Sequence, residues 1–221
     1  MPSATSFRCA ALLFDFDGVL VDSTAAVARQ YTVWALEHGL DPAWVLRAAH
    51  GVRTVEVIRQ AAPHLDAEAE TSKIEQREAD DRSVRLMPGA IELVNSIPAN
   101  RWGVVTSGRR ALATSRIHRL RIPMPRVLVT AEDVTQGKPA PDPYLKGAEL
   151  LGVAPQTCVV VEDAVAGIQS AHAAGMRVVS LPSTYPAEEL QEADVVVPEL
   201  QRIRVSLDGN GPNGDLIVQF S

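Results

Sequence analysis

The sequence predicts an α/β protein in which a parallel sheet, covered by helices on both faces, carries a separate helical insertion. Two observations lead to this fold class. Between residues 88 and 197, short runs that are apolar throughout alternate with stretches of helical spacing, which is typical of a parallel sheet buried on both sides. Between Ser23 and about Arg85 the spacing is helical only, although residues 7–16, which are predicted to form a buried strand, precede it. Since that first strand must join the later ones, the helical stretch is an insertion.

The insertion is predicted to contain three or four helices and no strand. The first helix, at residues 24–38, stops at Gly39, a residue that commonly follows a helix C-terminus. Helical spacing returns at residues 44–49, 54–62 and 67–82. We therefore expect a catalytic core made of residues 1–22 and 86–221, and a helical cap domain made of residues 23–85.

The core elements are expected to alternate in chain order. A helix with proline in its first turn covers residues 88–96, and further helices cover residues 110–120, 142–152 and 165–174. After the first strand at residues 7–16, the predicted strands are residues 102–106, 127–130, 158–161, 177–181 and 194–197. The tail from Asp208 is rich in Gly, Asn and Pro, and its last apolar run, residues 216–220, is either an extra edge strand or part of an unstructured end.

The composition narrows the classes of function. Of 221 residues, 46% are hydrophobic and 22% charged, an ordinary globular balance. The net charge of −6 gives no basic surface, so we expect neither nucleic acid nor an anionic membrane as a partner. The apolar run at residues 9–14 is too short for a signal peptide, and no stretch has the length of a membrane span. Two isolated cysteines favour a reducing cytoplasm.

The polar residues that follow the strands are the candidate functional residues, because ligands of an open parallel sheet bind beyond the carboxyl ends of its strands. Asp15 and Asp17 follow the first strand, and residues two apart in extended chain face the same side. One carboxylate can attack phosphorus while the other transfers protons. A bare Asp-x-Asp is more often an acidic turn. The longer DFDGVLVDS, directly after a buried strand, favours the catalytic interpretation.

Two further strand ends carry groups suited to a phosphate. Thr106 and Ser107 offer hydroxyl groups and backbone N–H groups before a helix, where they could hold phosphate oxygens or simply cap the helix. Lys138 lies between Gly137 and Pro139 in a short loop. A lone lysine is usually solvated, but a lysine in such a restricted loop could serve as a fixed positive charge beside phosphoryl oxygens.

The fourth strand end carries Glu162 and Asp163. Two carboxylates that close an apolar strand would be unfavourable inside the core. At the strand end they could bind Mg²⁺ together with Asp15, because Mg²⁺ prefers a few carboxylates, water and phosphate oxygens. The competing interpretation is an acidic helix N-terminus. Successive strands are thus followed by residues with complementary roles: a nucleophile, an acid, phosphate-binding groups and metal ligands.

The segments DFDGVLVDS, VVTSG, GKPAPDPYL and VVVEDAVAGIQSAHAAG resemble the four motifs of the haloacid dehalogenase superfamily, over almost the whole chain to about Val197. The resemblance implies a Rossmann-like core with a helical cap inserted after the first motif, and Mg²⁺ as the cofactor. It also implies a role for each motif residue: Asp15 as the nucleophile, Asp17 as the general acid and base whose backbone carbonyl contacts the metal, Thr106 and Lys138 on the phosphate, and Glu162 and Asp163 on Mg²⁺.

Within this superfamily three branches compete. Dehalogenases have no need for a second acid, so Asp17 favours phosphate chemistry. β-Phosphoglucomutases carry a histidine that helps to block hydrolysis at the position of Val27, and their cap loop differs from the HGVRT of this chain. That loop instead resembles the group of glycerol-3-phosphatases and 2-deoxyglucose-6-phosphatases. His50 and Arg53 of the loop are our candidates for cap residues that contact substrate, although such residues in a turn are usually just solvated.

We therefore expect a monomeric, Mg²⁺-dependent phosphatase that hydrolyses a small sugar or polyol phosphate through an aspartyl-phosphate. A mutase of the β-phosphoglucomutase type is the alternative within the same superfamily. A catalytically silent binding protein is the alternative from another class, although no expected catalytic position is substituted.

Overall fold

A six-stranded parallel sheet forms the centre of the protein, as predicted. The structure is a computed structural model that describes residues 6–209 and 214–221. All neighbouring strands of this sheet run parallel, in the order β6-β5-β2-β7-β8-β9. The strands are β2 (Ala11–Phe14), β5 (Trp102–Val105), β6 (Val127–Val129), β7 (Cys158–Glu162), β8 (Arg177–Ser180) and β9 (Val195–Val196).

Helices cover both faces of the sheet, because alternate side chains of each strand point to opposite sides. Leu12 and Phe14 of β2 belong to the hydrophobic cluster that includes α5 (Ala90–Asn95) and α6 (Arg110–Leu120). Leu13 belongs to the cluster on the other face, with α7 (Asp142–Leu151) and α8 (Val165–Ala173). The predicted α/β class is therefore confirmed. The helix at residues 110–120 was predicted with the bounds that the structure has, and the others differ by one or two residues at their ends.

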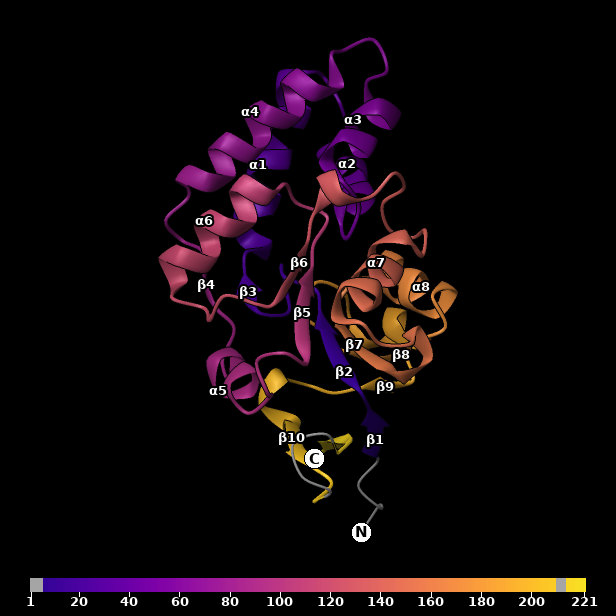
Figure 1. Cartoon of the computed structure of the whole chain (residues 1–221). Helices are drawn as coiled ribbons and strands as arrows, with labels where there is room; N and C mark the ends of the chain where they lie inside the picture. The colour runs from indigo at the N-terminus through magenta and orange to yellow at the C-terminus, as the bar shows by residue number, and fades with distance from the viewer. Residues whose placement is uncertain (1–5, 210–213) are drawn as a thin grey trace.

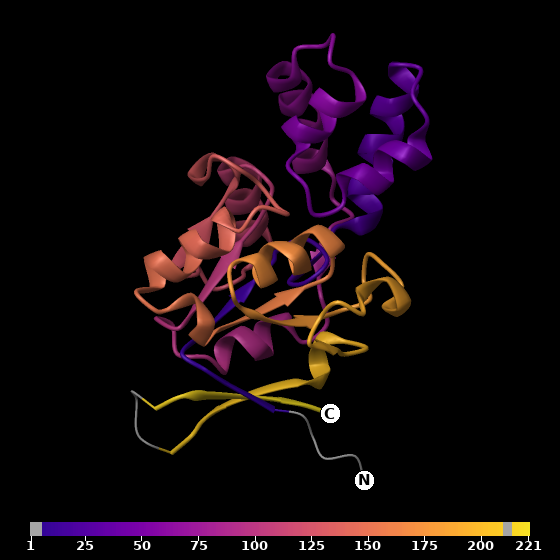
Figure 2. The same ribbon diagram turned by 90° about the vertical axis from the view of Figure 1, so that its right-hand side faces the viewer.

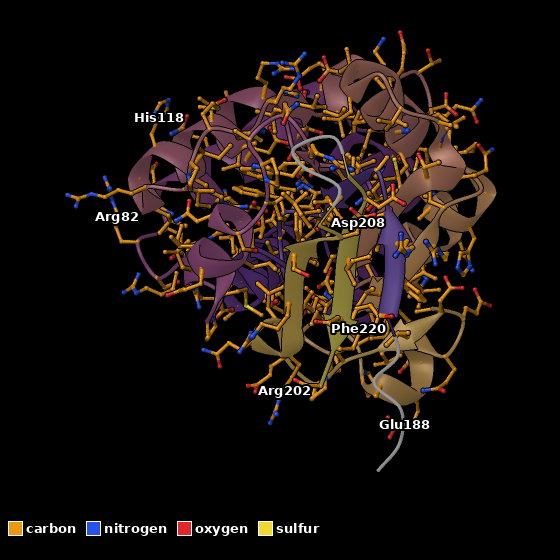
Figure 3. The ribbon with its side chains drawn as sticks, turned by 60° about the horizontal axis from the view of Figure 1, so that its bottom comes forward. Arg82, His118, Glu188, Arg202, Asp208 and Phe220 are labelled. Atoms are coloured by element: carbon orange, nitrogen blue, oxygen red, sulfur yellow. The ribbon has the colours of Figure 1, made fainter. Side chains whose placement is uncertain are left out.

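The predicted first strand, residues 7–16, is wrong in one respect, since it is two strands in two sheets. β1 (Ser6–Cys9) pairs antiparallel with β11 (Leu216–Phe220), which also pairs with β10 (Ile203–Leu207). Figure 3 shows these three strands side by side. Residues 216–220 thus form a central strand, neither an edge strand nor an unstructured end, and β10 was not predicted. Residues 210–213 of the predicted tail lie outside the described residues.

Arg101 holds the chain where it passes from one sheet to the other. Its guanidinium donates to the carbonyl oxygen of Ala10 at 2.6 Å, to that of Cys9 at 3.4 Å, and to that of Gly214. Val218 and Phe220 of β11 pack into the same hydrophobic cluster as α5 and α6. The small sheet therefore closes the end of the core opposite to the helical insertion (Figures 1 and 2).

The inserted helices are α1 (Thr24–Glu37), α2 (Pro42–Ala49), α3 (Thr54–Ala61) and α4 (Ala67–Asp80). They share a hydrophobic cluster of their own, which includes Trp34, Ile58 and Ile74. Figures 1 and 2 show the four helices gathered at one end of the molecule, beyond the parallel sheet. The chain enters and leaves this layer through a short antiparallel pair, β3 (Val21–Asp22) and β4 (Arg85–Leu86). The predicted division into a core and a cap of residues 23–85 stays a prediction, which this pairing supports.

Throughout residues 6–209 and 214–221, each helix falls short of the length and apolar character that a membrane span requires.

The small sheet should contribute measurably to the stability of the core. We predict that Leu216→Ala, which empties a fully buried position on β11, lowers the free energy of unfolding by about 2–5 kcal/mol. Gln219→Ala, on the exposed face of the same strand, is the control and should change it by less than about 0.5 kcal/mol. Urea denaturation would measure both. Equal, small effects would show that the small sheet packs independently of the core.

Candidate active site

A buried lysine joins the ends of three strands. The Nζ atom of Lys138 donates to Asp15 Oδ1 at 2.5 Å, to Glu162 Oε1 at 2.6 Å and to the carbonyl oxygen of Val105 at 3.3 Å. The Lys138 side chain is only 1% exposed. Burial by itself would lower the pKa of Lys138, but the carboxylates of Asp15 and Glu162 outweigh it and raise that pKa. The lysine is therefore a fixed positive charge at the carboxyl edge of the sheet.

Asp15 lies at the end of β2 with its carboxylate against this lysine. Its backbone N–H donates to the carbonyl oxygen of Val161 at 2.9 Å, which continues the pairing of β2 with β7. Burial raises the pKa of Asp15, Lys138 opposes that rise, and the neighbouring charge of Glu162 adds to it. The carboxylate thus needs more positive charge than Lys138 supplies to be fully ionised at neutral pH.

Three carboxylates gather where a metal ion could bind. Asp15, Glu162 and Asp163 each offer an oxygen, and these atoms lie within 4.8 Å of one another. Burial, together with the charges of Glu162 and Asp15, raises the pKa of Asp163 well above its usual range. Three buried carboxylates against one ammonium group leave an excess of negative charge. The donor set therefore fits a divalent cation that prefers oxygen ligands.

The members of this group are not equivalent. Asp15 and Asp163 line the cavity described below, whereas Glu162 lies behind them. Its Oε1 accepts from Lys138 and, at 2.9 Å, from the Tyr144 hydroxyl group, and its Oε2 accepts from the backbone N–H groups of Asp163 and Ala164. Glu162 therefore orients the lysine and the start of the next loop. The Asp17 carboxylate is outside the group and accepts from Ser23 Oγ at 2.5 Å.

Gly18 and Thr184 shape the surroundings of the Asp163 carboxylate. Gly18 has a φ of +81°, and a Cβ atom there would overlap the Asp163 carboxylate, so only glycine fits this position. The Thr184 hydroxyl group donates to Asp163 Oδ2, and the Ser183 hydroxyl group donates to the carbonyl oxygen of Gly18 at 2.6 Å. Thr184 was not predicted as a site residue. It follows strand β8, so its position after a strand is the signal in the sequence that points to it.

Thr106 and Ser107 both lie at the end of β5 and line the cavity. The Thr106 side chain is buried, and its Oγ1 accepts from the backbone N–H of Gly108 at 3.1 Å. The Ser107 hydroxyl group instead donates to the carbonyl oxygen of Gly51 in the helical insertion, at 2.8 Å. Ser107 therefore connects the core to the inserted helices as well as lining the cavity.

A cavity of about 90 Å³ lies between the inserted helices and these strand ends. The insertion contributes His50 at the α2–α3 turn, and the His50 ring meets the Tyr185 ring edge-on at 5.3 Å between centroids. Burial lowers the pKa of His50, so its imidazole is neutral at pH 7. The other cavity residues from the insertion and its start include Val27, Tyr31, Gly51, Thr54, Glu75 and Glu78, and those from the core include Asp15, Asp17, Thr106, Ser107 and Asp163.

Arg53 was predicted beside His50 as a substrate-contacting residue, and the structure does not bring it to the cavity. Its guanidinium donates to the backbone carbonyls of Ala131, Val134 and Thr135, at 3.4, 3.2 and 2.9 Å. These residues belong to the core loop that leads to Lys138. Arg53 therefore fastens the α2–α3 turn to the core.

Three charged residues of the site were missed from the sequence. Glu75 and Glu78 lie on one face of α4 and line the cavity, and burial raises the pKa of each to about 7. Arg116 of α6 is 2% exposed and donates to Asp17 Oδ1 at 2.5 Å. Helical charges at a spacing of three residues are usually solvated, and α6 and its flanks hold several arginines. Their burial depends on contacts far apart in the chain, so no local pattern identifies them.

The fold and the site are those of a hydrolase family. Residues 12–181 match the haloacid dehalogenase-like hydrolases, and the chain belongs to that family. The resemblance found in the sequence motifs is therefore confirmed.

Similar proteins include enzymes of known activity. Hexitol phosphatase A of Escherichia coli is 43% identical over 221 residues, covering 96% of this chain and 100% of that protein. Glycerol-1-phosphate phosphohydrolase 2 of Saccharomyces cerevisiae is 34% identical, covering 90% of this chain and 86% of its own. A solved structure, a hydrolase from Pseudomonas syringae, has a TM-score of 0.78 at 25% identity and covers 86% of this chain and 94% of its own.

The buried Glu75 carboxyl should make stability depend on pH. Its pKa is about 7 in the folded protein, against an ordinary value of 4.5. Between these values the unfolded chain binds fewer protons than the folded one, so this group's contribution to stability decreases as the pH rises from about 4.5 to 7. We predict that Glu75→Gln stabilises the protein by up to about 3 kcal/mol at pH of about 8 and by much less at pH of about 5.

Urea denaturation at the two pH values would measure this difference. Glu68→Gln replaces an exposed carboxylate on the same helix, 61% exposed, and should change stability by less than about 1 kcal/mol at either pH. A stabilisation by Glu75→Gln that is the same at both pH values would contradict the predicted pKa shift.

Proposed function

We propose that this protein is a phosphatase that hydrolyses the phosphate monoester of a small sugar or polyol, with Mg²⁺ as its metal ion. The observation that carries the proposal is the contact of buried Lys138 with Asp15, which lines the cavity beneath the inserted helices. A carboxylate fixed in this way can attack phosphorus, and the lysine can offset the negative charge of the phosphoryl oxygens. Two relatives, a hexitol phosphatase and a glycerol-1-phosphate phosphohydrolase, act on substrates of this chemical class by their names.

The reaction has two steps on one aspartate. Asp15 attacks phosphorus, and the bond from phosphorus to the substrate oxygen breaks as Asp17 gives that oxygen a proton. Asp17 then takes a proton from water, whose oxygen bonds to phosphorus and releases Asp15 and inorganic phosphate. Thr106 and Lys138 hold the phosphoryl oxygens during both steps. The second half therefore restores both aspartates.

Mg²⁺ fits the carboxylate group at the cavity. Asp15 and Asp163, which line the cavity, would hold the ion together with the backbone carbonyl of Asp17, and Glu162 would support them from behind. When bound, the ion supplies positive charge to the transferring phosphoryl group. The raised pKa values of Asp15 and Asp163 support this assignment, because both carboxyls require a cation nearby to be ionised at neutral pH.

The cavity supports a small, hydroxyl-rich substrate. Its volume of about 90 Å³ restricts the bound molecule to a small one. Glu75 and Glu78 line its wall on the side of the insertion, and their carboxylates can accept hydrogen bonds from substrate hydroxyl groups. Closure of the inserted helices over a bound substrate would exclude bulk water from the reacting phosphate.

The competing assignment is a phosphosugar mutase. Val27 lies in the cavity wall, at the position where the mutases that this sequence resembles carry a histidine. A valine side chain can neither donate nor accept a proton, so it offers no means of holding back hydrolysis. This difference favours water as the acceptor of the phosphoryl group.

We further propose that the protein acts as a cytoplasmic monomer without nucleic-acid or membrane partners. This chain itself supplies the groups that the proposed reaction uses. Cys9 and Cys158 are buried and unpaired, which suits a reducing compartment. The net charge of −6 disfavours polyanions.

Phosphate release from a panel of esters would test the proposed function. We predict Mg²⁺-dependent release from glycerol and hexose phosphates, and a loss of at least about 10³-fold in kcat for Asp15→Asn, with the fold intact by circular dichroism. Conversion of β-glucose 1-phosphate to glucose 6-phosphate without phosphate release would identify a mutase. Activity of Asp15→Asn near that of the unaltered protein would rule out Asp15 as the nucleophile.

A further inference from the structure

Arg116 is a buried cation that has no role in the reaction steps proposed above. It lies on α6 of the core, its side chain is 2% exposed, and it contacts carboxylates from two parts of the chain. Its Nη1 atom donates to Asp17 Oδ1 at 2.5 Å, and its Nη2 atom donates to Glu78 Oε2 of α4 at 3.0 Å. Within the described residues its Nε atom has no hydrogen-bond partner. A buried guanidinium is unfavourable unless paired, so these two carboxylates account for its place.

The hydrogen bonds to Asp17 distinguish its two oxygens. Oδ1 accepts from Arg116 and, at 2.5 Å, from the Ser23 hydroxyl group. Within the described part of the chain, Oδ2 accepts no hydrogen bond, and the Asp17 side chain is 31% exposed and lines the cavity. An arginine can only donate, so the oxygen that faces it cannot carry a proton without losing that contact. A proton on Asp17 therefore resides on Oδ2, the oxygen available to the cavity.

We propose that Arg116 is a positioning residue for the general acid and base: it holds Oδ1 of Asp17 so that the transferable proton lies on Oδ2, toward the substrate. This inference rests on the proposed phosphatase function. In the first step the proton on Oδ2 moves to the oxygen that leaves phosphorus, and in the second step Oδ2 takes a proton from water. Glu78 holds the other end of the guanidinium, so the inserted helix α4 takes part in orienting Asp17.

A merely structural role for Arg116 predicts a different kinetic effect. If the arginine only neutralises buried carboxylates, its loss should slow the reaction of every substrate alike. If it positions the proton of Asp17, the loss should depend on the leaving group. An alkoxide needs the proton to depart, whereas p-nitrophenolate leaves without one. The value of kcat/KM isolates the first step for both substrates.

The experiment compares kcat/KM for glycerol 3-phosphate and p-nitrophenyl phosphate. We predict that Arg116→Met lowers the ratio of the two values (alkyl over aryl) by about 10²-fold, the size of a general-acid contribution, and that Asp17→Asn lowers it similarly. Arg116→Lys keeps the charge but loses the planar pair of donors, and should lower the ratio by about tenfold. The Arg116→Lys variant also tests the proposal if Arg116→Met does not fold.

Arg119→Met is the matched control. Arg119 lies on the same helix and donates to the backbone carbonyls of Ala79 and Asp81, so its loss should leave the ratio within about threefold. Equal losses for both substrates in the Arg116 variants would overturn the positioning role. The proposed function would fail separately, if the unaltered protein released no phosphate from either ester or if Asp17→Asn left the ratio unchanged.

Discussion

The burial of Lys138 between Asp15 and Glu162 is the constraint on which the rest of the structure depends. Charges removed from water must be paired, so the loop that carries this lysine must meet the carboxyl ends of β2 and β7 at one point. The parallel sheet supplies that point, since all of its strands end at the same edge. One ammonium group does not balance the carboxylates of Asp15, Glu162 and Asp163, and this excess of negative charge favours a cation at the edge of the sheet. The pairing of Lys138 with Asp15 and Glu162 therefore stabilises the fold and also places charge where the proposed chemistry needs it.

The inserted helices complete the site through three kinds of contact with the core. Ser107 donates to the carbonyl of Gly51, Arg53 donates to the loop that precedes Lys138, and Arg116 pairs with Glu78 of α4. Each contact ends within a few residues of a group that touches the cavity. The position of the insertion and the geometry of the proposed catalytic groups are therefore linked, and Arg116 extends this link from Glu78 to Asp17.

Much of this arrangement could be predicted from the sequence, because apolar strands followed by polar residues are a local signal. The four motifs predicted Asp15, Lys138 and Asp163 at one edge, and the structure brings them together. The small antiparallel sheet could not be predicted, because β1 pairs with residues near the other end of the chain, and residues 7–16 contain no glycine or proline that would mark a break between two strands. Arg53 was expected to contact substrate because it lies close to His50 in the sequence. Its guanidinium instead donates to backbone carbonyls at residues 131–135 of the core, and partners so distant in the chain give no local signal. Likewise, nothing local separates Arg116 from its exposed neighbours on α6.

The most direct test of the central claim is to trap the covalent intermediate. An aryl phosphate, whose first step is fast, should let a phosphoryl group accumulate on the enzyme, and rapid acid quenching followed by peptide mass spectrometry would locate it. We predict one phosphoryl group on the peptide that contains Asp15, present only with Mg²⁺ and absent from Asp15→Asn. A phosphoryl group on any other residue, or hydrolysis with inversion at phosphorus and no phosphorylated peptide, would contradict it.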